Sequence, residues 1–244
     1  MNRETTNWVR FAIEELVPPI LRDSPPFRGA MKMAWGKHID DLASFRERAA
    51  FLTDEEYEQL YRDHPRVHKG TDNSEACIQK IAQSVAGKSV ADIGCGTGVL
   101  LERVREQNSQ LDRIAGIDFV IDDAAKLDGI EYHAARIESL PFADNEFDTV
   151  ICTHVLEHVL DFKGSLAELR RICKEKLIVV VPREREYRYS FNPHFNFFPY
   201  KHSFLRMAFP IPESYVCEDI GRDIFYCEVP SQADAENSDK LEKV

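Results

Sequence analysis

The chain has 244 residues, of which 43% are apolar and 30% are charged, and its formal net charge at pH 7 is −11. That length can bury the core of one α/β domain with a small appended segment, and the composition is that of a globular protein. The negative net charge argues against a general nucleic-acid or anionic-membrane binder, because phosphates attract basic surfaces, but it allows a local basic site.

Neither a signal peptide nor a membrane span is expected. Residues 1–8 lack an apolar core of signal-peptide length and include an early acid, Glu4. No segment approaches the roughly 20 consecutive apolar residues that a bilayer span requires. The six cysteines are scattered without a CxxC pair, and two of them lie in apolar runs, where cysteine behaves as a small hydrophobic residue. We therefore expect a cytoplasmic protein with reduced thiols and no membrane partner.

Residues 1–85 have the pattern of short helices separated by prolines. The expected helices cover about residues 8–16, 39–51, 53–63 and 74–85. Pro18-Pro19 and Pro25-Pro26 interrupt the first part of this segment, and Thr53 to Glu56 has the form of a capping box. We expect residues 1–85 to form a helical segment of their own.

From Lys88 the pattern changes to short apolar runs that alternate with helical segments. The expected strands cover residues 89–93, 114–117, 147–152, 177–181 and 224–229, and the expected helices cover 98–106, 122–127 and, in two pieces, 155–173. This alternation predicts parallel strands joined by crossover helices. Residues 86–230 are therefore assigned to an α/β core, and the polar, acidic residues 231–244 to a disordered tail.

The most informative stretch is a glycine-rich turn, Asp-Ile-Gly-Cys-Gly-Thr-Gly, at residues 92–98. It follows an apolar strand and precedes a helix. Glycine permits a tight turn and lets a ligand approach the backbone, and the N-terminus of the following helix offers free N–H groups. The alternative is a plain strand-to-helix turn, but such a turn seldom needs three glycines in five residues. The pattern favours a ligand-binding turn.

A carboxylate at the end of the next strand narrows the choice of ligand. Asp118 follows Gly98 by twenty residues, and an acid at the end of the second strand can accept hydrogen bonds from both ribose hydroxyls. A nicotinamide dinucleotide also satisfies these two features. The turn, however, has the spacing GxGxG rather than GxGxxG, and Asp92 suits a ligand that carries an amino group and a sulfonium rather than a pyrophosphate.

These residues resemble the class I S-adenosylmethionine-dependent methyltransferases. The matching pieces, in the family's order and spacing, are residues 92–98, 116–118, 138–142, 146–152 and 155–159. The resemblance covers about residues 70–182. It implies a Rossmann-like, doubly wound, mostly parallel seven-stranded sheet with residues 1–85 as an N-terminal helical cap or lid, and S-adenosyl-L-methionine as the cofactor.

The resemblance also implies which residues bind the cofactor. Gly94 and Gly96 would lie beneath its methionine and ribose, with Asp92 near the amino group, and Asp118 would hold the ribose diol. The complete expected set is Asp92, Gly94, Cys95, Gly96, Gly98, Asp118, Phe119, Ile137, Glu138 and Thr153. In this set Phe119, Ile137 and Glu138 surround the adenine, and Thr153 offers its carbonyl to the amino group.

One position departs from the family pattern. Relatives often carry an Asp two positions before the Glu of the Glu-Ser-Leu-Pro-Phe segment, where it accepts from the adenine amine. This chain has Arg136 there, and a guanidinium cannot accept a hydrogen bond. The contact to the adenine amine is therefore expected from another group, such as a backbone carbonyl.

Candidate groups for the chemistry are histidines. Methyl transfer is an in-line displacement, in which the protein mainly supplies proximity and orientation. A hydroxyl acceptor also benefits from a general base with a pKa near neutrality. His154 follows the fourth strand at its C-terminal end, where open α/β sheets bind ligands, and His194 is the second candidate base. The alternative interpretation of His154 is a packed side chain that lies outside the binding pocket.

His158 lies four residues after His154, so on a helix the two imidazoles would share a face. Such spacing is also found in metal sites, but no third ligand is evident nearby in the sequence, and we expect no metal. A packed helix residue bonded to backbone is the favoured interpretation of His158.

Residues 183–206 are rich in aromatic and basic side chains, with five Lys or Arg against two Glu. Aromatic walls with arginine suit a planar or sugar-like acceptor that carries a carboxylate or phosphate. The alternative is that the aromatic rings pack against the N-terminal helices and the charges face water. Tyr61, His68 and Lys69 are further candidates for contact with the cofactor carboxylate.

The sequence thus predicts a methyltransferase that acts on a small or medium-sized, possibly anionic acceptor, with oxygen favoured over nitrogen. The preference for oxygen rests on the available histidines and on the lack of an Asn-Pro-Pro-Tyr-type motif after the fourth strand. A non-catalytic methyltransferase-fold partner subunit and a nicotinamide-dependent oxidoreductase are the rival interpretations. No nucleic-acid partner is expected, and the oligomeric state is not predicted.

Overall fold

The computed structural model describes residues 12–35, 70–122, 124, 126–186 and 193–230, together with 47–48, 50–53, 55–56 and 59. The described residues belong to two compact units. Those within 1–69 and 184–199 form the helical unit, and those within 70–183 and 200–230 form the sheet unit.

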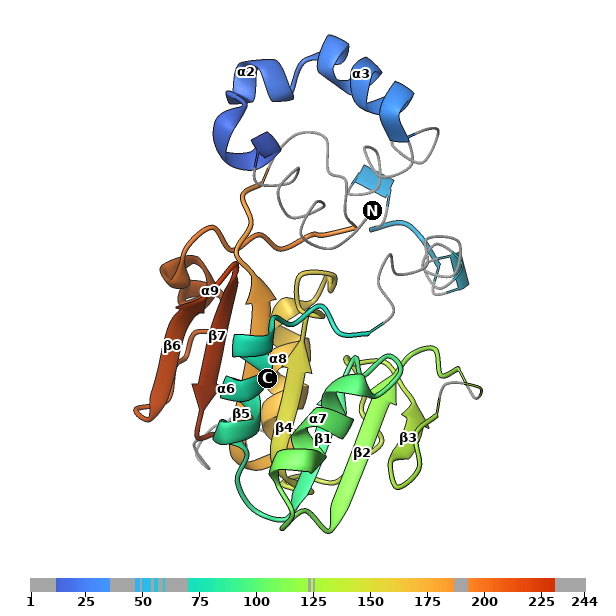
Figure 1. The fold of residues 1–244 in the computed structure, drawn as a ribbon, viewed down its shortest axis with the longest axis vertical. Coiled ribbons are helices and arrows are strands. Elements are labelled where there is room, and N and C mark those ends of the chain that lie inside the picture. Colours follow the sequence, from blue (N-terminus) through green and yellow to red (C-terminus); the bar gives the residue numbers. More distant parts are fainter. Residues whose placement is uncertain are drawn as a thin grey trace, which may run out of the picture. The chain divides into compact units, whose positions relative to one another are not determined.

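The sheet unit contains a seven-stranded sheet with the strand order β3-β2-β1-β4-β5-β7-β6 (Figure 1). Its strands are β1 (Ser89–Ile93), β2 (Arg113–Asp118), β3 (Glu131–Ala134), β4 (Phe147–Thr153), β5 (Cys173–Pro182), β6 (Tyr215–Ile220) and β7 (Asp223–Glu228). β1 to β5 pair in parallel, whereas β7 is antiparallel to both β5 and β6. The predicted mostly parallel, doubly wound sheet of seven strands is confirmed.

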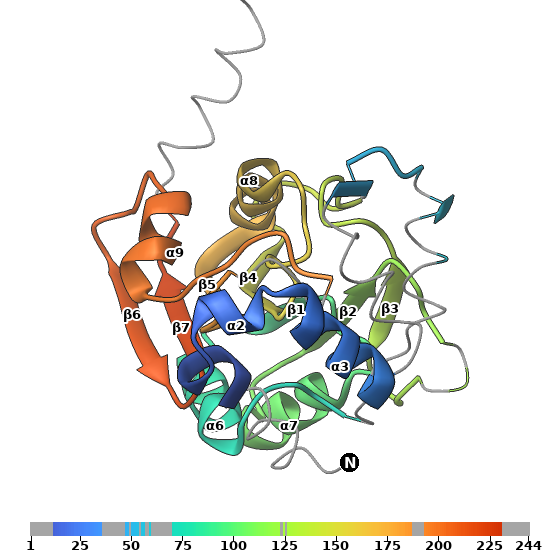
Figure 2. The ribbon, with the colours of Figure 1, turned by 90° about the horizontal axis from the view of Figure 1, so that it is seen from above.

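Helices cover both faces of this sheet. They are α6 (Glu75–Ser84), α7 (Val99–Gln107), α8 (Phe162–Ile172) and α9 (Lys201–Met207). Figures 1 and 2 show α6 and α7 on one face and α8 on the other. The central strands are buried on both sides over most of their length, which explains the apolar runs at residues 90–91, 150–152 and 177–181 of β1, β4 and β5.

α6 belongs to the core of the sheet unit. The Ser74 side chain caps the helix by accepting from the backbone N–H of Cys77 at 3.3 Å. Cys77 and Ile81 are fully buried and pack in one cluster with Leu101. The sequence prediction placed this helix in the N-terminal segment 1–85. In the structure its apolar side chains share the core of the sheet, so it is grouped with residues that follow it.

Several local predictions differ from the structure. The sequence prediction does not locate β3, β6 or α9. The two strands are edge strands whose residues are largely exposed, so neither contains a long apolar run. The described residues of 122–127 do not form the expected helix. The helix expected over 155–173 begins only at Phe162, since the Asp161 side chain caps it by accepting from Gly164 N at 2.9 Å.

A buried ionic network attaches the C-terminal hairpin, formed by β6 and β7, to α8. The Arg170 guanidinium contacts both carboxylate oxygens of Glu228 at 2.7 and 2.8 Å, and it donates to the carbonyls of Ala208 and Pro210. The hydroxyl of Tyr226 also donates to Glu228. Because the Glu228 side chain is almost fully buried, this pairing satisfies a charge that would otherwise be costly.

The helical unit contains a π-helical turn (Ala12–Leu16), α2 (Pro19–Arg22) and α3 (Pro25–Trp35). The predicted capping box is confirmed. Thr53 N donates to Glu56 Oε2 at 2.8 Å, and Glu56 N donates to Thr53 Oγ1 at 3.3 Å. Residues 1–11 and 36–46, most of the helix expected after Thr53, and the tail 231–244 lie outside the described residues.

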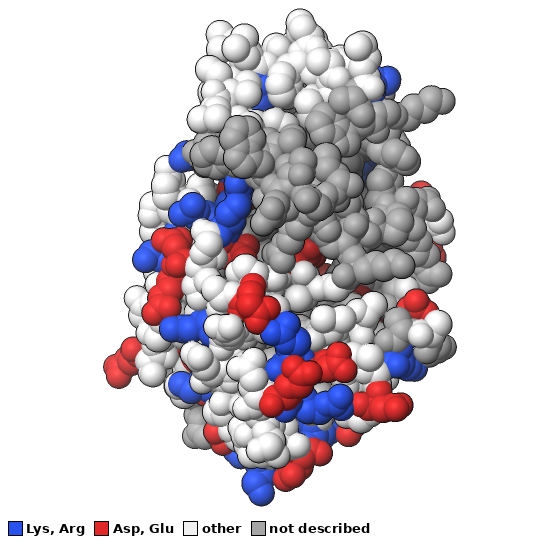
Figure 3. Space-filling model, in the orientation of Figure 1, with Lys and Arg blue, Asp and Glu red and all other residues white. Residues whose placement is uncertain are grey.

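The surface view shows how charge is distributed on one face of the molecule. Lys and Arg side chains are interspersed there with Asp and Glu (Figure 3). Among the described helices, none has the length and apolar character needed to cross a membrane.

Asp148 joins the first residues of β1 and β4. Its carboxylate accepts from the backbone N–H groups of Lys88 and Ser89 at 2.8 and 3.1 Å, and Lys174 Nζ lies 3.1 Å away. The Lys88 N–H, and after it the Lys174 ammonium and Ser89, lower the pKa of Asp148 to about 2 despite partial burial.

Replacement of Asp148 by Asn should therefore destabilise the fold. The pKa in the folded state is below its unfolded value, so the stabilisation is present above about pH 4 and is lost as the pH falls toward 2. We expect Asp148→Asn to lower the free energy of unfolding by about 2 kcal/mol at neutral pH and by much less at about pH 2.5. Urea unfolding at both pH values measures this. Asp112→Asn is the control, because its ion pair with Lys88 is exposed. An equal loss at both pH values would contradict the assignment.

Candidate functional site

The turn between β1 and α7 is attached to the neighbouring strand β2. The backbone N–H groups of Gly94 and Cys95 both donate to the carbonyl of Ile117, at 2.7 and 3.0 Å. Gly94 and Gly98 have φ angles of +83° and +82°, which favour glycine. A Cβ on Gly94 would lie 2.1 Å from a Val155 methyl carbon. The turn thus requires glycine for both backbone and space, and α7 begins directly after it.

Asp118 closes the turn from the end of β2. Its Oδ2 accepts from the backbone N–H of Gly96 at 2.9 Å, and its Oδ1 lies 3.4 Å from the N–H of Val120. Only 9% of Asp118 is exposed. The carboxylate is therefore oriented by backbone donors beside the glycine turn.

Strand register brings the predicted residues to one edge of the sheet. Ile93 of β1 lies opposite Ile117 of β2 and Cys152 of β4. The residues that follow these three are Gly94, Asp118 and Thr153. Figure 1 shows the three strands ending at the same edge. Asp92, 2% exposed, lies one residue before Ile93. In open parallel sheets this carboxyl edge is where ligands bind.

A residue that the sequence did not single out contacts the end of β4. The Nδ2 of Asn73 donates to Thr153 Oγ1 at 3.0 Å and to Thr71 Oγ1 at 2.9 Å. Asn73 is 1% exposed. The only signal in the sequence was its place just before the capping Ser74, which does not reveal a partner eighty residues away.

His154 lies among carboxylates at the same edge. It has a φ of +56°, which is uncommon for a residue with a side chain. Its Nδ1 lies 3.6 Å from Glu157 Oε1, and its Nε2 lies 4.0 Å from Asp223 Oδ1. Burial lowers the pKa of His154, but the hydrogen bond and charge of Glu157, with the charges of Asp223 and Asp72, outweigh it, and the net pKa is raised.

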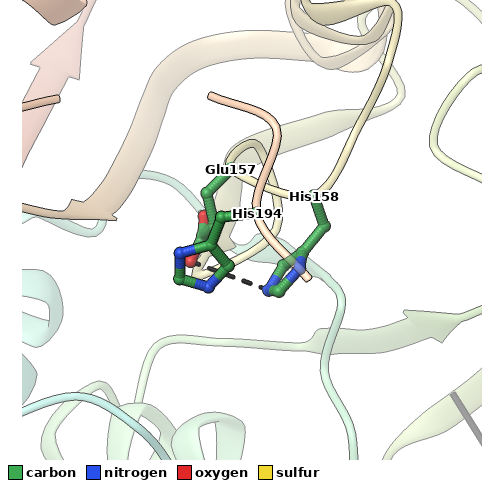
Figure 4. Close-up of side chains that lie close together, drawn as sticks. All are labelled: Glu157, His158 and His194. Carbon is green, nitrogen blue, oxygen red and sulfur yellow. Dashed lines mark ion pairs between the residues drawn. The ribbon is translucent and has the colours of Figure 1, made fainter. Parts of the chain in front are cut away.

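His158 also contacts Glu157, and both residues belong to a turn rather than to a helix. The expectation that His154 and His158 share one face of a helix is wrong. Residues 156–158 form a turn, in which His158 N donates to the Val155 carbonyl at 2.8 Å. His158 Nε2 lies 3.9 Å from Glu157 Oε1 (Figure 4). Glu157 is 1% exposed, so one buried carboxylate is flanked by two imidazoles.

The segment expected at the adenine edge is held by α8. The Arg171 guanidinium donates to the carbonyls of Leu140 and Phe142 at 3.0 and 2.7 Å and pairs with Asp144 at 3.0 Å. It also pairs with both carboxylate oxygens of Glu168, at 2.7 and 2.9 Å. All five guanidinium N–H groups are used, so this loop is firmly attached to the helix.

The residues before that loop lie near one another. Ile137 is buried, and Arg136 Nε lies 3.5 Å from Glu138 Oε2. Phe119 is half-buried just after β2. This ion pair directs the Arg136 side chain to Glu138.

In the helical unit, His194 forms a buried pair with Glu184. Its Nδ1 lies 2.8 Å from Glu184 Oε2, and both residues are less than 10% exposed. Of the aromatic rings between 183 and 206, Phe198 and Phe204 are fully buried. Phe204 packs on Tyr226 of β7, with ring centroids 5.0 Å apart, so this ring is buried in the sheet unit and not against the N-terminal helices. Tyr61, His68, Lys69 and residues 187–192 lie outside the described residues.

Comparison with solved structures supports the fold. A protein from Pyrococcus horikoshii superimposes with a TM-score of 0.52 at 17% identity, over 72% of this chain and 99% of that chain. A SAM-dependent methyltransferase from Aquifex aeolicus gives a TM-score of 0.50 at 15% identity, over 63% and 88%. At these identities the likeness shows the fold alone.

Comparison with curated sequences finds relatives over about a third of the chain. A ubiquinone biosynthesis O-methyltransferase of Bordetella parapertussis is 37% identical over 93 residues, which are 34% of this chain and 37% of that protein. A 2-phytyl-1,4-naphtoquinone methyltransferase of Trichormus variabilis is 32% identical over 98 residues, or 36% and 43%. The chain thus matches less than half the length of these relatives.

Residues 91–181 match a family model described as a methyltransferase domain. The matched segment is similar to methyltransferase domains, and it is named the methyltransferase domain after this match. The methyltransferase domain runs from β1 to β5 and therefore contains the glycine turn, Asp118, and the end of β4 with His154. Asn73 and Asp223, which contact this edge, come from outside the matched segment.

Substitution of Gly94 tests the geometry of the turn in the methyltransferase domain. Gly94→Ala combines a strained φ with a clash against Val155, and we expect it to cost about 3 kcal/mol of unfolding free energy. Adding Val155→Ala should recover part of that loss, because it removes the clashing methyl. Thermal or urea unfolding measures both.

The matched control is Gly221→Ala, which has a φ of +63° but no atom within 4 Å of the added Cβ. It carries the backbone strain alone, so it should cost less than Gly94→Ala. If the losses from Gly94→Ala and Val155→Ala simply added in the double variant, the clash would be disproved.

Proposed function

We propose that this protein is a methyltransferase that transfers a methyl group from S-adenosyl-L-methionine to a hydroxyl oxygen of a small or medium-sized acceptor. The observation that carries the proposal is that the glycine turn, the Asp118 carboxylate and the partly buried His154 all lie at one edge of the sheet. The family match of residues 91–181 supports the reaction type. One relative is named an O-methyltransferase, which supports oxygen as the acceptor atom.

The residues at the sheet edge fit the cofactor. Bound S-adenosyl-L-methionine supplies a methyl group that is already activated on a sulfonium sulfur. Asp118 would accept from the ribose hydroxyls, and the absence of side chains at Gly94 and Gly96 would let the cofactor approach the backbone. The remaining proposed contacts are Asp92, Cys95, Gly98, Phe119, Ile137, Glu138 and the carbonyl of Thr153.

His154 is the proposed general base. Glu157 beside Nδ1 would keep the proton on that nitrogen and leave Nε2 to accept the proton of the acceptor hydroxyl. The raised pKa makes His154 a stronger base, which is neutral only at a higher pH. His194 with Glu184 is a second carboxylate-bound imidazole and the alternative base.

Charge at this edge bears on the acceptor. Glu157, Asp223 and Asp72 all act electrostatically on His154. Three carboxylates around one imidazole favour a neutral hydroxyl there over an anionic group.

Calorimetry with S-adenosylmethionine and S-adenosylhomocysteine tests the proposal. Wild-type protein should bind both, and Asp118→Ala should weaken binding at least about tenfold, because the ribose hydroxyls lose a charged acceptor. Asp112→Ala is the matched control, since it removes an exposed carboxylate at the opposite end of β2. No binding by the wild type, or equal binding by Asp118→Ala, would refute the proposal.

The two alternative functions can be tested with the same protein preparation. Binding of NADH, followed by its fluorescence, would instead indicate an oxidoreductase. Cofactor binding without turnover on any acceptor would indicate a non-catalytic subunit.

The pH profile of turnover on a phenolic acceptor tests His154. The rate should rise with pH through a pKa above the ordinary value near 6.5, because only neutral imidazole accepts a proton. His154→Ala should lower kcat by about 10²- to 10⁴-fold. Glu157→Gln should move the rise to lower pH, since it removes the carboxylate that raises the pKa.

His202→Ala is the control, because His202 is exposed and stacked on Tyr200. An unchanged rate in His154→Ala would transfer the role to His194, which His194→Ala then tests. Loss of activity on treatment with a chelator, restored by a divalent cation, would contradict the general-base role by assigning these imidazoles to a metal.

A further inference from the structure

The peptide group between Thr153 and His154 is held from two directions. On one side, His154 N donates to the carbonyl of Val180 in β5 at 2.9 Å. In a planar trans peptide the C=O points opposite to the N–H, so the Thr153 carbonyl is directed away from β5. β1 is the other neighbour of β4, and the glycine turn follows it. The Thr153 carbonyl therefore points toward the side of the glycine turn.

The second attachment comes from Asn73. Its two amide N–H groups have two acceptors, the hydroxyl oxygens of Thr153 at 3.0 Å and Thr71 at 2.9 Å. The backbone N–H of Asn73 also donates to Thr71 Oγ1, at 3.2 Å. Asn73 and Thr153 are 1% and 8% exposed, so water does not readily replace this bond. Asn73 thus ties the segment before α6 to the last residue of β4.

We propose that Asn73 is a positioning residue for the amino-acid end of the cofactor. It acts through Thr153: by holding the threonine side chain, it fixes the peptide whose carbonyl accepts from the cofactor's amino group. This inference rests on the proposed function and adds to it a residue outside the matched methyltransferase domain. It also explains why the buried side chain of Asn73 lies directly before Ser74, the N-cap residue of α6.

If Asn73 has this role, its removal should weaken only the contacts to the amino-acid end of the ligand. S-adenosylhomocysteine carries the amino-acid end, whereas 5′-methylthioadenosine has the same adenosine and sulfur without it. A change that moves the Thr153 carbonyl should weaken binding of the first and leave the second unaffected. A general loss of structure would weaken both.

The experiment is calorimetry of the full chain with these two ligands. Asn73→Ala should weaken S-adenosylhomocysteine binding about tenfold, the loss expected for a buried hydrogen bond, with 5′-methylthioadenosine binding unchanged. Thr153→Val, which keeps the carbonyl and removes the hydroxyl, should reproduce this selective loss. The double variant should be no worse than either single one, because both remove the same bond.

Asn108→Ala is the matched control. Asn108 is also buried, and its Nδ2 likewise donates twice, to the carbonyls of Ala82 and Val104 at 3.0 Å each. It lies at the C-terminal end of α7, away from the carboxyl edge of the sheet. It should lose stability and bind both ligands normally.

Three results distinguish the possibilities. Wild-type protein that binds neither ligand would refute the proposed function itself. Wild-type protein that binds both, with Asn73→Ala weakened equally for both or for neither, would overturn the positioning role and leave the proposed function intact. If Asn73→Ala does not fold, Thr153→Val alone tests the positioning role through the ratio of the two affinities.

Discussion

The site depends on one carbonyl, that of Ile117, which accepts the N–H groups of both Gly94 and Cys95. This pair of bonds ties the turn after β1 to the end of β2, so the turn cannot move independently of the Asp118 carboxylate. Gly96 N then bonds to that carboxylate and completes the connection. Because α7 starts from the same turn, its N-terminal N–H groups are held in place as well. A rigid turn of this kind lets backbone groups recognise a ligand without side chains.

The end of β4 supplies the other half of the site through charge and backbone direction. Glu157 and Asp223 face the two ring nitrogens of His154, and the left-handed backbone of His154 turns the chain out of the strand. The same peptide that binds β5 directs the Thr153 carbonyl the opposite way. The end of β4, the charges around His154 and the orientation of the peptide between Thr153 and His154 are therefore coupled to one another.

Two arginines on α8 attach the site's surroundings to the scaffold. Arg170 holds the C-terminal hairpin through Glu228, and β7 of that hairpin carries Asp223 to His154. Arg171 holds the loop that follows Ile137 and Glu138. The two residues are neighbours in sequence but hold different parts of the chain, the β6–β7 hairpin and the loop between β3 and β4. Loops at the candidate site are thus positioned by a helix to which they do not belong.

Local pattern in the sequence determined the central strands, the helix after the glycine turn and the position of Asp118. Buried parallel strands must be apolar runs, and a tight turn with positive φ must use glycine. It did not determine β3 or β6, whose exposed edge residues carry no apolar signal. Only the tertiary structure decided that Asp223 meets His154 and that Asn73 meets Thr153 across eighty residues. Such contacts depend on strand order and register, which arise from packing of the whole sheet and leave no trace in the neighbouring sequence.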